Sequence, residues 1–419
     1  MTPVDGGLGL ALFDDANIQN PHPLYAQMHR SGPVHRIGDS DFYAVSGWDA
    51  VNEAVARCDD FSSNLTATMM YEPGGTITEF PIGELGGPTQ ALATADDPVH
   101  AVHRKLLLPQ LVAKRIRAFE PFIAQTADEL WNMNTDNGIE WMAAIADKLP
   151  MMIVGRIIGV PDTDIDKLIR WGYSATQVVE GLVTPTQMEA ATVAVMELGG
   201  YVTEQFRQAA ANPRDNLLGD LATACATGEL DDLAALTMMI TLFSAGGEST
   251  ASLLGSAAWI LATFPHIQRQ LRAQPELLDI FLEEVLRYEP PFRGHYRHVV
   301  ADTELHGFKL PAGSRLILLW GAANRDSSHF DDPAEFRLDR PTAKNHITFG
   351  RGAHFCIGAA LARLEARIVI GHLLQHSTNI IATDTGRWLP SLLVRRLESL
   401  HLTIDVPDTA DRSGTRRQL

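Results

Sequence analysis

A short glycine-rich segment that contains a single cysteine constrains this chain more than any other feature. The segment covers residues 349–358 and includes Cys356, and an Ala-, Leu-, Arg- and Glu-rich run with helical periodicity follows over residues 359–374. A sulfur at the start of a helix meets unpaired backbone N–H groups and the positive end of the helix dipole, which favour the thiolate over the thiol. Cys356 is therefore a candidate anion and metal ligand.

Composition excludes several classes of partner. The 419 residues carry a net charge of −17, which argues against a nucleic-acid-binding body and against a membrane surface held by basic patches. The longest apolar stretches, such as residues 233–245, are too short to span a bilayer, and no signal peptide precedes Pro3. The 3 cysteines form no CxxC pair, as in a reducing compartment. We expect a cytoplasmic protein with no membrane span and no nucleic-acid partner.

Hydrophobic periodicity predicts a mainly α-helical fold with small appended β-sheets. Apolar residues at three- and four-residue spacing dominate the chain after Asp97. The predicted helices cover residues 100–114, 116–132, 141–158, 164–179, 185–211 and 217–226, and the predicted strands cover residues 34–37, 42–45, 299–305, 308–310 and 314–320. No domain linker is evident, so we expect one domain over residues 1–419, with an irregular segment at 1–19 and a frayed tail at 407–419.

The long apolar run over residues 231–264 has an unusual centre. Gly246 and Gly247 together cost a helix interior about 2 kcal/mol relative to alanines, and a buried Glu248 adds a desolvation cost. One interpretation is close packing of another helix on the glycines, with Glu248 facing solvent. The other is a local kink whose open carbonyls admit a ligand or water, with Glu248 and an adjacent alcohol passing protons. The run alone leaves both open.

A third motif pairs an acid with a base. Glu284 and Arg287 are three residues apart, so on a helix they share a face and can pair. Pairs at this spacing are usually solvated and worth a few tenths of a kcal/mol. The motif by itself is a weak signal.

Taken together, these motifs resemble those of a soluble bacterial cytochrome P450. The resemblance rests on Phe349-x-x-Gly352-x-x-x-Cys356-x-Gly358, on Glu284-x-x-Arg287 and on Ala245-Gly246-x-Glu248-Ser249-Thr250, in this order along the chain. The stretch Asp96-Asp97-Pro98-Val99-His100-x-x-x-Arg104 is similar to the start of the family's propionate-binding helix. The likeness covers about residues 20 to 405. It implies the cytochrome P450 fold, with haem between the long central helix and the helix after the cysteine loop.

The resemblance also implies the roles of particular residues. Cys356 is expected to be the proximal thiolate ligand of the iron of haem b. The basic residues expected to hold the haem propionates are His100, Arg104, Arg297 and His354. The other expected contacts with the cofactor come from Phe349, Gly350, Ala245 and Gly246. Glu284 and Arg287 are expected to join Arg340 in a buried network that braces the cysteine loop.

The sequence departs from the family pattern at the proton-relay alcohol. Ser249 stands where the family usually has threonine, and Thr250 follows it. Serine keeps the hydroxyl group but lacks the methyl group that restricts its rotamer. We expect Glu248 and Ser249 to deliver protons during dioxygen activation, with Thr250 as the alternative hydroxyl.

The function implied is a monooxygenase that uses O2 to oxidise a small lipophilic organic substrate. Electrons would come from NAD(P)H through a ferredoxin-type donor and its reductase, because the chain contains no reductase or flavin motif. The alternatives are a non-catalytic haem-thiolate binding or sensing protein and a peroxide-driven haem enzyme. The expected pocket walls are residues 62–97, 171–198, 292–295 and 388–393, together with the glycine pair.

Two groups of basic residues need interpretation. The first group consists of Arg351, Arg104, Lys105, Lys114 and Arg115. These residues form either a positive patch suited to an acidic electron donor or a set of solvated charges. Four histidines have no matching family position and are expected to be ordinary surface or core residues: His103, His295, His298 and His329.

Overall fold

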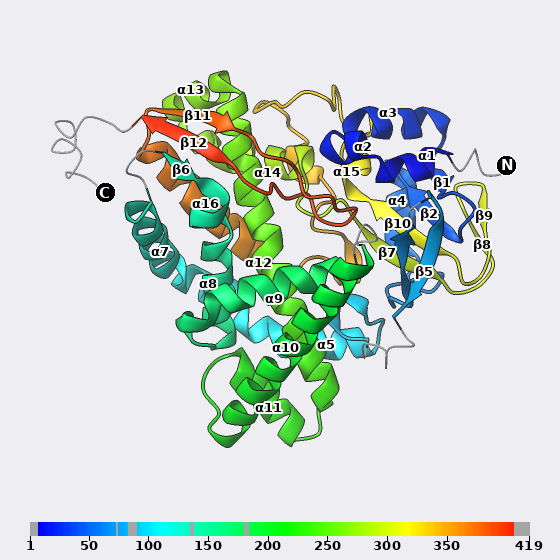
Figure 1. Cartoon of the computed structure of the whole chain (residues 1–419), viewed down its shortest axis with the longest axis horizontal. Helices are drawn as coiled ribbons and strands as arrows, with labels where there is room; N and C mark the ends of the chain where they lie inside the picture. The colour runs from blue at the N-terminus through cyan, green and yellow to red at the C-terminus, as the bar shows by residue number, and fades with distance from the viewer. Residues whose placement is uncertain (1–6, 73, 83–89, 135–137, 180–183, 406–419) are drawn as a thin grey trace.

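The central element of the fold is helix α12, Asp232–Thr263, around which the other helices are arranged (Figure 1). The computed structural model describes residues 7–72, 74–82, 90–134, 138–179 and 184–405. At about 1.5 Å per residue the 32 residues of α12 extend about 48 Å, enough to cross the molecule. The helix begins cleanly because the Asp231 carboxylate accepts hydrogen bonds from the backbone N–H groups of Leu233 and Ala234, at 2.9 and 3.1 Å.

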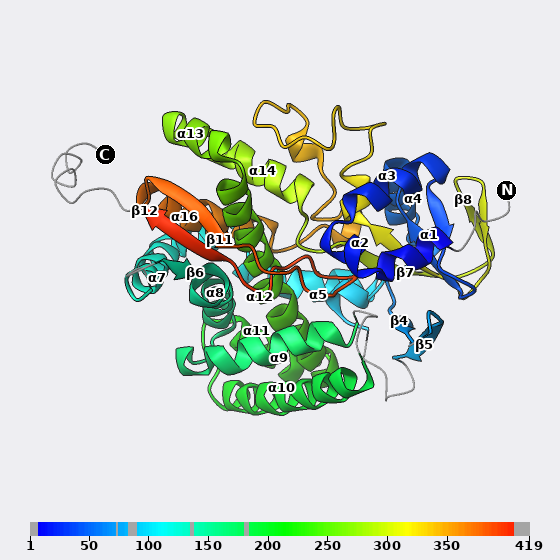
Figure 2. The ribbon, with the colours of Figure 1, turned by 45° about the horizontal axis from the view of Figure 1, so that its top comes forward.

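The remaining helices surround α12 in chain order. They are α1 Gly7–Leu10, α2 Asp15–Gln19, α3 His22–Ser31, α4 Trp48–Ala56, α5 Val99–Leu107, α6 Ala113–Ala118, α7 Glu120–Asn132, α8 Lys148–Ile158, α9 Ile165–Gln177, α10 Pro185–Ala211, α11 Leu217–Ala226, α13 Pro265–Ala273, α14 Leu278–Tyr288, α15 Trp320–Ala323 and α16 Ala359–Gln375. In Figure 2, α9 and α10 form a layer below α12. Of the described residues, no helix combines the length and apolar character that a membrane crossing requires.

The strands form small separate sheets rather than one large sheet. The largest has the order β1-β2-β10-β7-β3, and β10 is parallel to β2, with Ile317 opposite Ala44. A second sheet has the order β11-β12-β6, and two hairpins pair β4 with β5 and β8 with β9. The bounds are β1 Val34–Arg36, β2 Phe42–Val45, β3 Phe61–Ser62, β4 Ala67–Tyr71, β5 Ile77–Pro81, β6 Ile139–Glu140, β7 Gly294–Val299, β8 Thr303–Leu305, β9 Phe308–Leu310, β10 Arg315–Leu319, β11 Asn379–Asp384 and β12 His401–Asp405.

The main hydrophobic core packs the second half of α12 against α14 and α16. Trp141 is fully buried there, and its indole N–H donates to the carbonyl of Leu254 at 3.0 Å. The indole N–H of this large side chain therefore has a hydrogen-bond acceptor although it is buried. The core thus holds α16, the helix that follows the cysteine loop, in a defined position against α12.

Several expectations from the sequence need correction. The segment before residue 20 is not irregular over its described part, because α1 and α2 lie within it; the helices are too short to show a period. The stretch 62–97, which lacks a clear sequence period and was expected to be a long irregular segment, contains the β4–β5 hairpin. The segment expected to be one helix at 141–158 opens with a π-helical turn, Met142–Ala146, before α8. The tail at 407–419 lies outside the described residues, and the single-domain organisation stays a prediction.

Candidate functional site

One cavity lies between the middle of α12 and the cysteine loop. From α12 its wall includes Ala245, Gly246 and Ser249, and from the cysteine loop it includes Phe349 and Cys356. These two stretches are far apart in sequence, and the packing of α16 against α12 brings them together. The cavity therefore has one wall with a sulfur and an opposite wall with hydroxyl groups.

Local backbone geometry shapes the cysteine loop. Gly350 and Gly352 have φ values of +66° and +65°, which side chains disfavour, so glycine permits the tight turn. The backbone N–H of Cys356 donates to the carbonyl of Phe349 at 2.8 Å and closes the loop. The Arg363 guanidinium carbon lies 4.4 Å from the centre of the Phe349 ring, which holds that ring on the side of the loop.

The cysteine thiol departs from the expectation of a stabilised thiolate. Burial raises the pKa of Cys356, although the backbone N–H groups of Gly358 and Ala359 and the charges of Arg104 and Arg363 act in the expected direction. The start of α16 therefore favours the thiolate, but by less than the desolvation of the buried sulfur disfavours it. A thiolate at this position needs a further positive charge, which a metal ion supplies.

Two histidines line the cavity beside the cysteine loop. The rings of His100 and His354 stack with centroids 4.0 Å apart. His354 Nε2 is 3.0 Å from the hydroxyl oxygen of Ser63, which comes from the segment after β3. The sequence did not predict the Ser63 contact, because nothing local links residues so far apart.

Two arginines complete the basic lining. Arg104 donates to the carbonyl of Phe355 at 2.8 Å, and Arg297 donates to the carbonyl of Tyr296 at 2.7 Å. Arg297 is buried, and burial lowers its pKa against the weaker opposing charge of Asp96, while within the described part of the chain no carboxylate oxygen lies within ion-pair distance of it. A buried guanidinium that faces a cavity and has no carboxylate ion-pair partner fits an anionic group bound there.

The glycine pair of α12 shows the close helix packing of the first interpretation, whereas Glu248 is buried, as the second interpretation requires. The helix continues through Gly246 and Gly247 without interruption, and α8 packs closely on them. A Cβ atom at Gly246 would lie 2.7 Å from Val154 Cγ2, and one at Gly247 would lie 2.5 Å from Met151 Cε. Close packing therefore explains the glycines. The interpretation that placed Glu248 in solvent is wrong, since its side chain is only 2% exposed.

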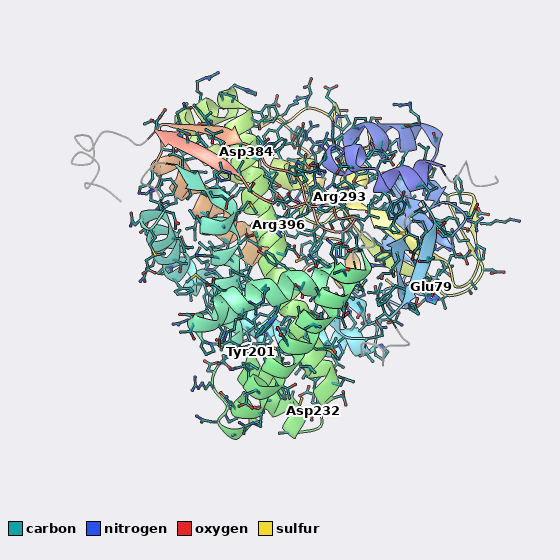
Figure 3. All side chains as sticks on the ribbon, in the orientation of Figure 1. Glu79, Tyr201, Asp232, Arg293, Asp384 and Arg396 are labelled. Atoms are coloured by element: carbon teal, nitrogen blue, oxygen red, sulfur yellow. The ribbon has the colours of Figure 1, made fainter. Side chains whose placement is uncertain are left out.

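Glu248 belongs to a buried charged cluster on the side of α12 away from the cavity lining. Its Oε1 accepts from Arg396 Nε at 3.3 Å, and Arg396 Nη1 is 3.4 Å from Asp147. Tyr173 donates to Asp147 at 3.1 Å. Burial, outweighing the charge of Arg396, raises the pKa of Glu248 to about 7. Figure 3 shows Arg396 over the middle of α12.

The two hydroxyls next to Glu248 do line the cavity. Ser249 Oγ donates to the carbonyl of Ala245 one turn earlier, at 2.5 Å, and Thr250 is buried in the wall. The structure thus places Ser249 and Thr250 at the cavity and Glu248 behind them.

The predicted buried network behind the cysteine loop is present. Glu284 and Arg287 are both fully buried and paired at 2.7 Å, and Arg340 reaches Glu284 at 3.0 Å. Arg287 also donates to three backbone carbonyls, which leaves its charge well satisfied. The weak-surface-pair interpretation of this motif is wrong.

An adjacent carboxylate was not predicted. Glu283 pairs with Arg363 at 2.5 Å and with His346 at 3.2 Å. Burial opposes its ionisation, but these two partners more than offset burial and lower the pKa of Glu283 to about 2. Since Arg363 stacks on Phe349, Glu283 holds the cysteine loop indirectly.

Several expected pocket walls lie elsewhere. Among the described residues, none from 171–198 or 388–393 lines the cavity, whereas Phe292 and His295 do. The predicted wall at 292–295 is thus confirmed, and the parallel expectation that His295 is an ordinary surface or core histidine is wrong. Its Nδ1 accepts from the indole N–H of Trp320 at 2.6 Å. The wall of α8 and α11 was not expected and consists of Val154, Ile157, Ile158 and Leu217.

The other three histidines behave as expected. His103 Nδ1 accepts from the backbone N–H of Leu92 at 3.2 Å, and His329 stacks on Trp48. His298 lies in β7, half-buried. None of the three lines the cavity.

A further acid in the wall was missed. Glu365, on the α16 face toward the cavity, is buried, and burial raises its pKa well above the usual range. Its Oε2 accepts no hydrogen bond from the part of the chain that the structure describes. Helical periodicity could not have indicated this position, because Cys356 precedes α16 and Glu365 reaches the cavity only through the packing of that helix.

Comparison with known proteins gives consistent results. A family model described as cytochrome P450 matches residues 189–389. The chain is 64% identical over 393 residues to Cytochrome P450 144 of Mycobacterium tuberculosis, covering 94% of this chain and 91% of that protein. It is 29% identical over 404 residues to the vitamin D(3) 25-hydroxylase of Pseudonocardia autotrophica, covering 94% and 96%. The structure of CYP109E1 from Bacillus megaterium in complex with testosterone superposes with a TM-score of 0.82 at 28% identity, covering 94% of this chain and 100% of that chain.

Proposed function

The chain belongs to the cytochrome P450 family of haem b monooxygenases, and we propose that it hydroxylates a lipophilic organic substrate at haem held by Cys356. Electrons come from NAD(P)H through a ferredoxin and its reductase. The observation that carries the proposal is the pairing, across one cavity, of the Cys356 sulfur with the Ser249 and Thr250 hydroxyls. The expected single domain and cytoplasmic location remain predictions.

The residues of the cavity fit haem chemically. Cys356 offers the sulfur, and the four basic groups His100, Arg104, Arg297 and His354 offer donors for two propionates. Among the described residues the buried Arg297 guanidinium has no carboxylate ion pair, so it suits a propionate, and a positive ion would hold Cys356 as the thiolate although burial raises the pKa of its thiol. Ala245, Gly246, Phe349 and Gly350 provide small or flat surfaces on either side. When bound, a thiolate-ligated haem supplies dioxygen activation, because thiolate donation favours O–O cleavage.

The chain's own residues handle the protons. The α12 hydroxyls in the cavity wall are those of Thr241, Ser249 and Thr250, and the last two adjoin Glu248 in sequence. Ser249 would pass a proton into the cavity once its hydroxyl turns away from the Ala245 carbonyl. Glu248, with a pKa near neutrality, can hold or release a proton at working pH. Because its side chain does not line the cavity, a proton from Glu248 reaches it only through water or a rotation of the side chain. Arg396 is a positioning residue for Glu248.

Apolar lining supports a lipophilic substrate. The cavity wall includes Leu92, Ala93, Leu242 and Phe292. Such a wall favours apolar molecules, with His295 available to orient one polar group. The names of two relatives mention vitamin D(3) and testosterone, so these two compounds are suitable first members of a substrate panel.

The surface beside the cysteine loop supports an external electron donor. Val99, Val102 and Phe355 are exposed apolar residues there, and such residues mark contact surfaces. Lys105 is 79% exposed, although it lies 3.8 Å from Glu229. The basic patch is therefore weaker than expected from the sequence, since Arg115 also pairs with Asp215 at 3.0 Å.

Steady-state turnover tests the proposed function. The purified holoprotein is mixed with NADPH, a ferredoxin, its reductase and each panel compound that shifts the ferric Soret band. Hydroxylated product that depends on the ferredoxin supports the proposal. Product formed only with added peroxide, or a reduced carbon monoxide complex without the thiolate-type Soret band, contradicts it.

Coupling in Ser249 variants tests the proton path. Ser249→Ala should raise the fraction of NADPH consumed that appears as hydrogen peroxide, because the donor at the cavity is lost. Ser249→Thr is the matched control, since it keeps the hydroxyl group, and it should preserve coupling. Unchanged coupling in Ser249→Ala together with loss in Thr250→Val would assign the role to Thr250.

A further inference from the structure

Three potential metal ligands meet where α7 and α16 lie side by side, apart from the cavity (Figures 1 and 2). Asp128 comes from α7, and His372 and His376 lie one turn apart near the end of α16. One ligand atom from each residue lies within 4.8 Å of the others. Residues four apart on a helix share a face, so both imidazoles point toward the same neighbouring helix.

Hydrogen bonding already orients His376 as a ligand. Its Nδ1 lies 3.0 Å from the backbone carbonyl of His372. A carbonyl oxygen only accepts, so Nδ1 carries the proton, and in the neutral ring Nε2 keeps its lone pair. A second nitrogen bonded to a backbone carbonyl is the arrangement that fixes the tautomer of metal-binding histidines.

The other two residues are already in contact. His372 Nε2 is 2.6 Å from Asp128 Oδ1, and the His372 and His376 rings stack with centroids 3.9 Å apart. Trp131 lies edge-on to the His372 ring and tilted to the His376 ring, with centroids 5.3 and 5.9 Å away, and restricts their movement. The Asp128 side chain is 60% exposed, so an ion can enter from solvent.

We propose that Asp128, His372 and His376 bind one Zn²⁺ ion, with water as the fourth ligand. Two imidazole nitrogens and one carboxylate oxygen are a ligand set that Zn²⁺ accepts in tetrahedral geometry, at about 2.0–2.2 Å from the metal. At that distance neighbouring ligands are about 3.3 Å apart, so the Asp128–His372 contact of 2.6 Å has to open by under about 1 Å, and ligand atoms as much as 4.8 Å apart have to close by about 1.5 Å. The exposed Asp128 side chain can supply this movement, and the proton shared with His372 leaves to solvent.

Zinc bound here would join α7 to the helix that begins beside the cysteine loop. α16 starts at Ala359, three residues after Cys356. An ion that binds the folded form alone stabilises it in proportion to the logarithm of its concentration over the dissociation constant. We therefore expect zinc to raise the temperature at which the holoprotein loses its Soret absorbance.

Metal analysis of the holoprotein tests the site. Holoprotein without an affinity tag is stripped with chelating resin, equilibrated with equal concentrations of Zn²⁺ or Mg²⁺ and analysed for zinc, magnesium and iron. The amount of haem iron gives the number of folded chains. One zinc per haem iron, with no retained magnesium, is the expected result, because imidazole ligands favour zinc over magnesium.

Matched variants assign the zinc to these residues. His376→Ala removes the free Nε2, and Asp128→Asn keeps an oxygen that accepts from His372, so its packing should be preserved. Zinc affinity should fall by about tenfold or more in both variants. His306→Ala is the control, because His306 pairs with Glu53 at 3.3 Å without a second histidine. Undiminished zinc in either variant, equal retention of magnesium, or no zinc in the unsubstituted protein would overturn the proposal.

Discussion

Two buried glutamates on either side of the cavity hold protons in opposite ways. Glu248 on α12 is 2% exposed and Glu283 on α14 is 5% exposed, yet the pKa of the first is raised to about 7 and that of the second is lowered to about 2. Glu248 receives one guanidinium hydrogen bond at 3.3 Å, whereas Glu283 receives two from Arg363, at 2.5 and 3.0 Å, and a contact from His346.

The difference shows that burial alone does not decide the charge of a carboxylate. Burial disfavours ionisation of both groups, and the number and geometry of the cationic donors decide the outcome. On the cysteine side, full pairing gives a fixed brace. On the α12 side, incomplete pairing gives a group that can exchange a proton near neutral pH.

The largest effect is expected from breaking the cysteine-side network. Arg287→Met leaves the fully buried Glu284 with Arg340 as its remaining side-chain partner and three backbone carbonyls without their donor. Removing one partner of such a buried pair costs about 3–5 kcal/mol of unfolding free energy. Urea unfolding followed by the Soret band measures this cost.

The control for this prediction is an exposed pair. Arg315 contacts Glu79 at 2.6 Å, but the Glu79 side chain is 44% exposed. Arg315→Met should change stability by about 1 kcal/mol or less, because solvent screens the pair. A similar loss of unfolding free energy in the two variants would show that the buried network stabilises the fold no more than an exposed pair does.

The second prediction concerns the pH dependence of stability. The folded-state pKa of Glu248, about 7, exceeds its ordinary value of 4.5, so the folded protein binds more protons than the unfolded chain between these pH values. The stabilisation is complete below pH 4.5 and is lost as pH rises through 7, amounting to about 3 kcal/mol. Glu248→Gln should remove the part of this slope that Glu248 contributes, measured by urea unfolding at several pH values, while the parts due to Asp147 and Glu365, whose pKa values burial also raises, remain.

Glu283→Gln provides the opposite case. The lowered pKa of Glu283 stabilises the fold above its ordinary value of 4.5, and this contribution is lost as pH falls through about 2. Its substitution should therefore lower stability at neutral pH and leave the slope from pH 5 to 7 unchanged. A slope in Glu248→Gln as steep as that of the unsubstituted protein would contradict the contribution assigned to Glu248.

The smallest effect concerns the packing that places the α12 cluster. Gly246→Ala forces Cβ against the stiff Val154 side chain, and overpacking of this kind costs about 1–3 kcal/mol. It should also shift α8 and with it Asp147, which precedes α8 and contacts Arg396. The double variant Gly246→Ala, Val154→Ala should recover stability, as measured by thermal unfolding.

Gly199→Ala in α10 is the matched control. A Cβ atom there meets nothing within 4 Å, so the helix should gain about 0.5–1 kcal/mol from the loss of a glycine. Equal effects at Gly199 and Gly246 would show that contact with α8 does not explain the α12 glycines.

Local sequence signals located much of the fold. The predicted helices at 185–211 and 217–226 coincide with α10 and α11, because long runs with helical periodicity and clear capping or terminating residues can be recognised from the sequence. The short helices α1 and α2 and the short strand β6 were not predicted, since each contains fewer residues than one helical or strand pattern needs.

By itself the sequence determined the cysteine loop, its basic neighbours and the Glu284–Arg287 pair, because each depends on spacing within one element or on a motif. Only the tertiary structure decided that Glu248 pairs with Arg396, which is 148 residues away. It also decided that α8 lines the cavity and that α16 carries His372 and His376 to Asp128. The physical reason is that such contacts depend on how segments distant in sequence pack together. Local periodicity does not indicate which residue will pair with a buried charge.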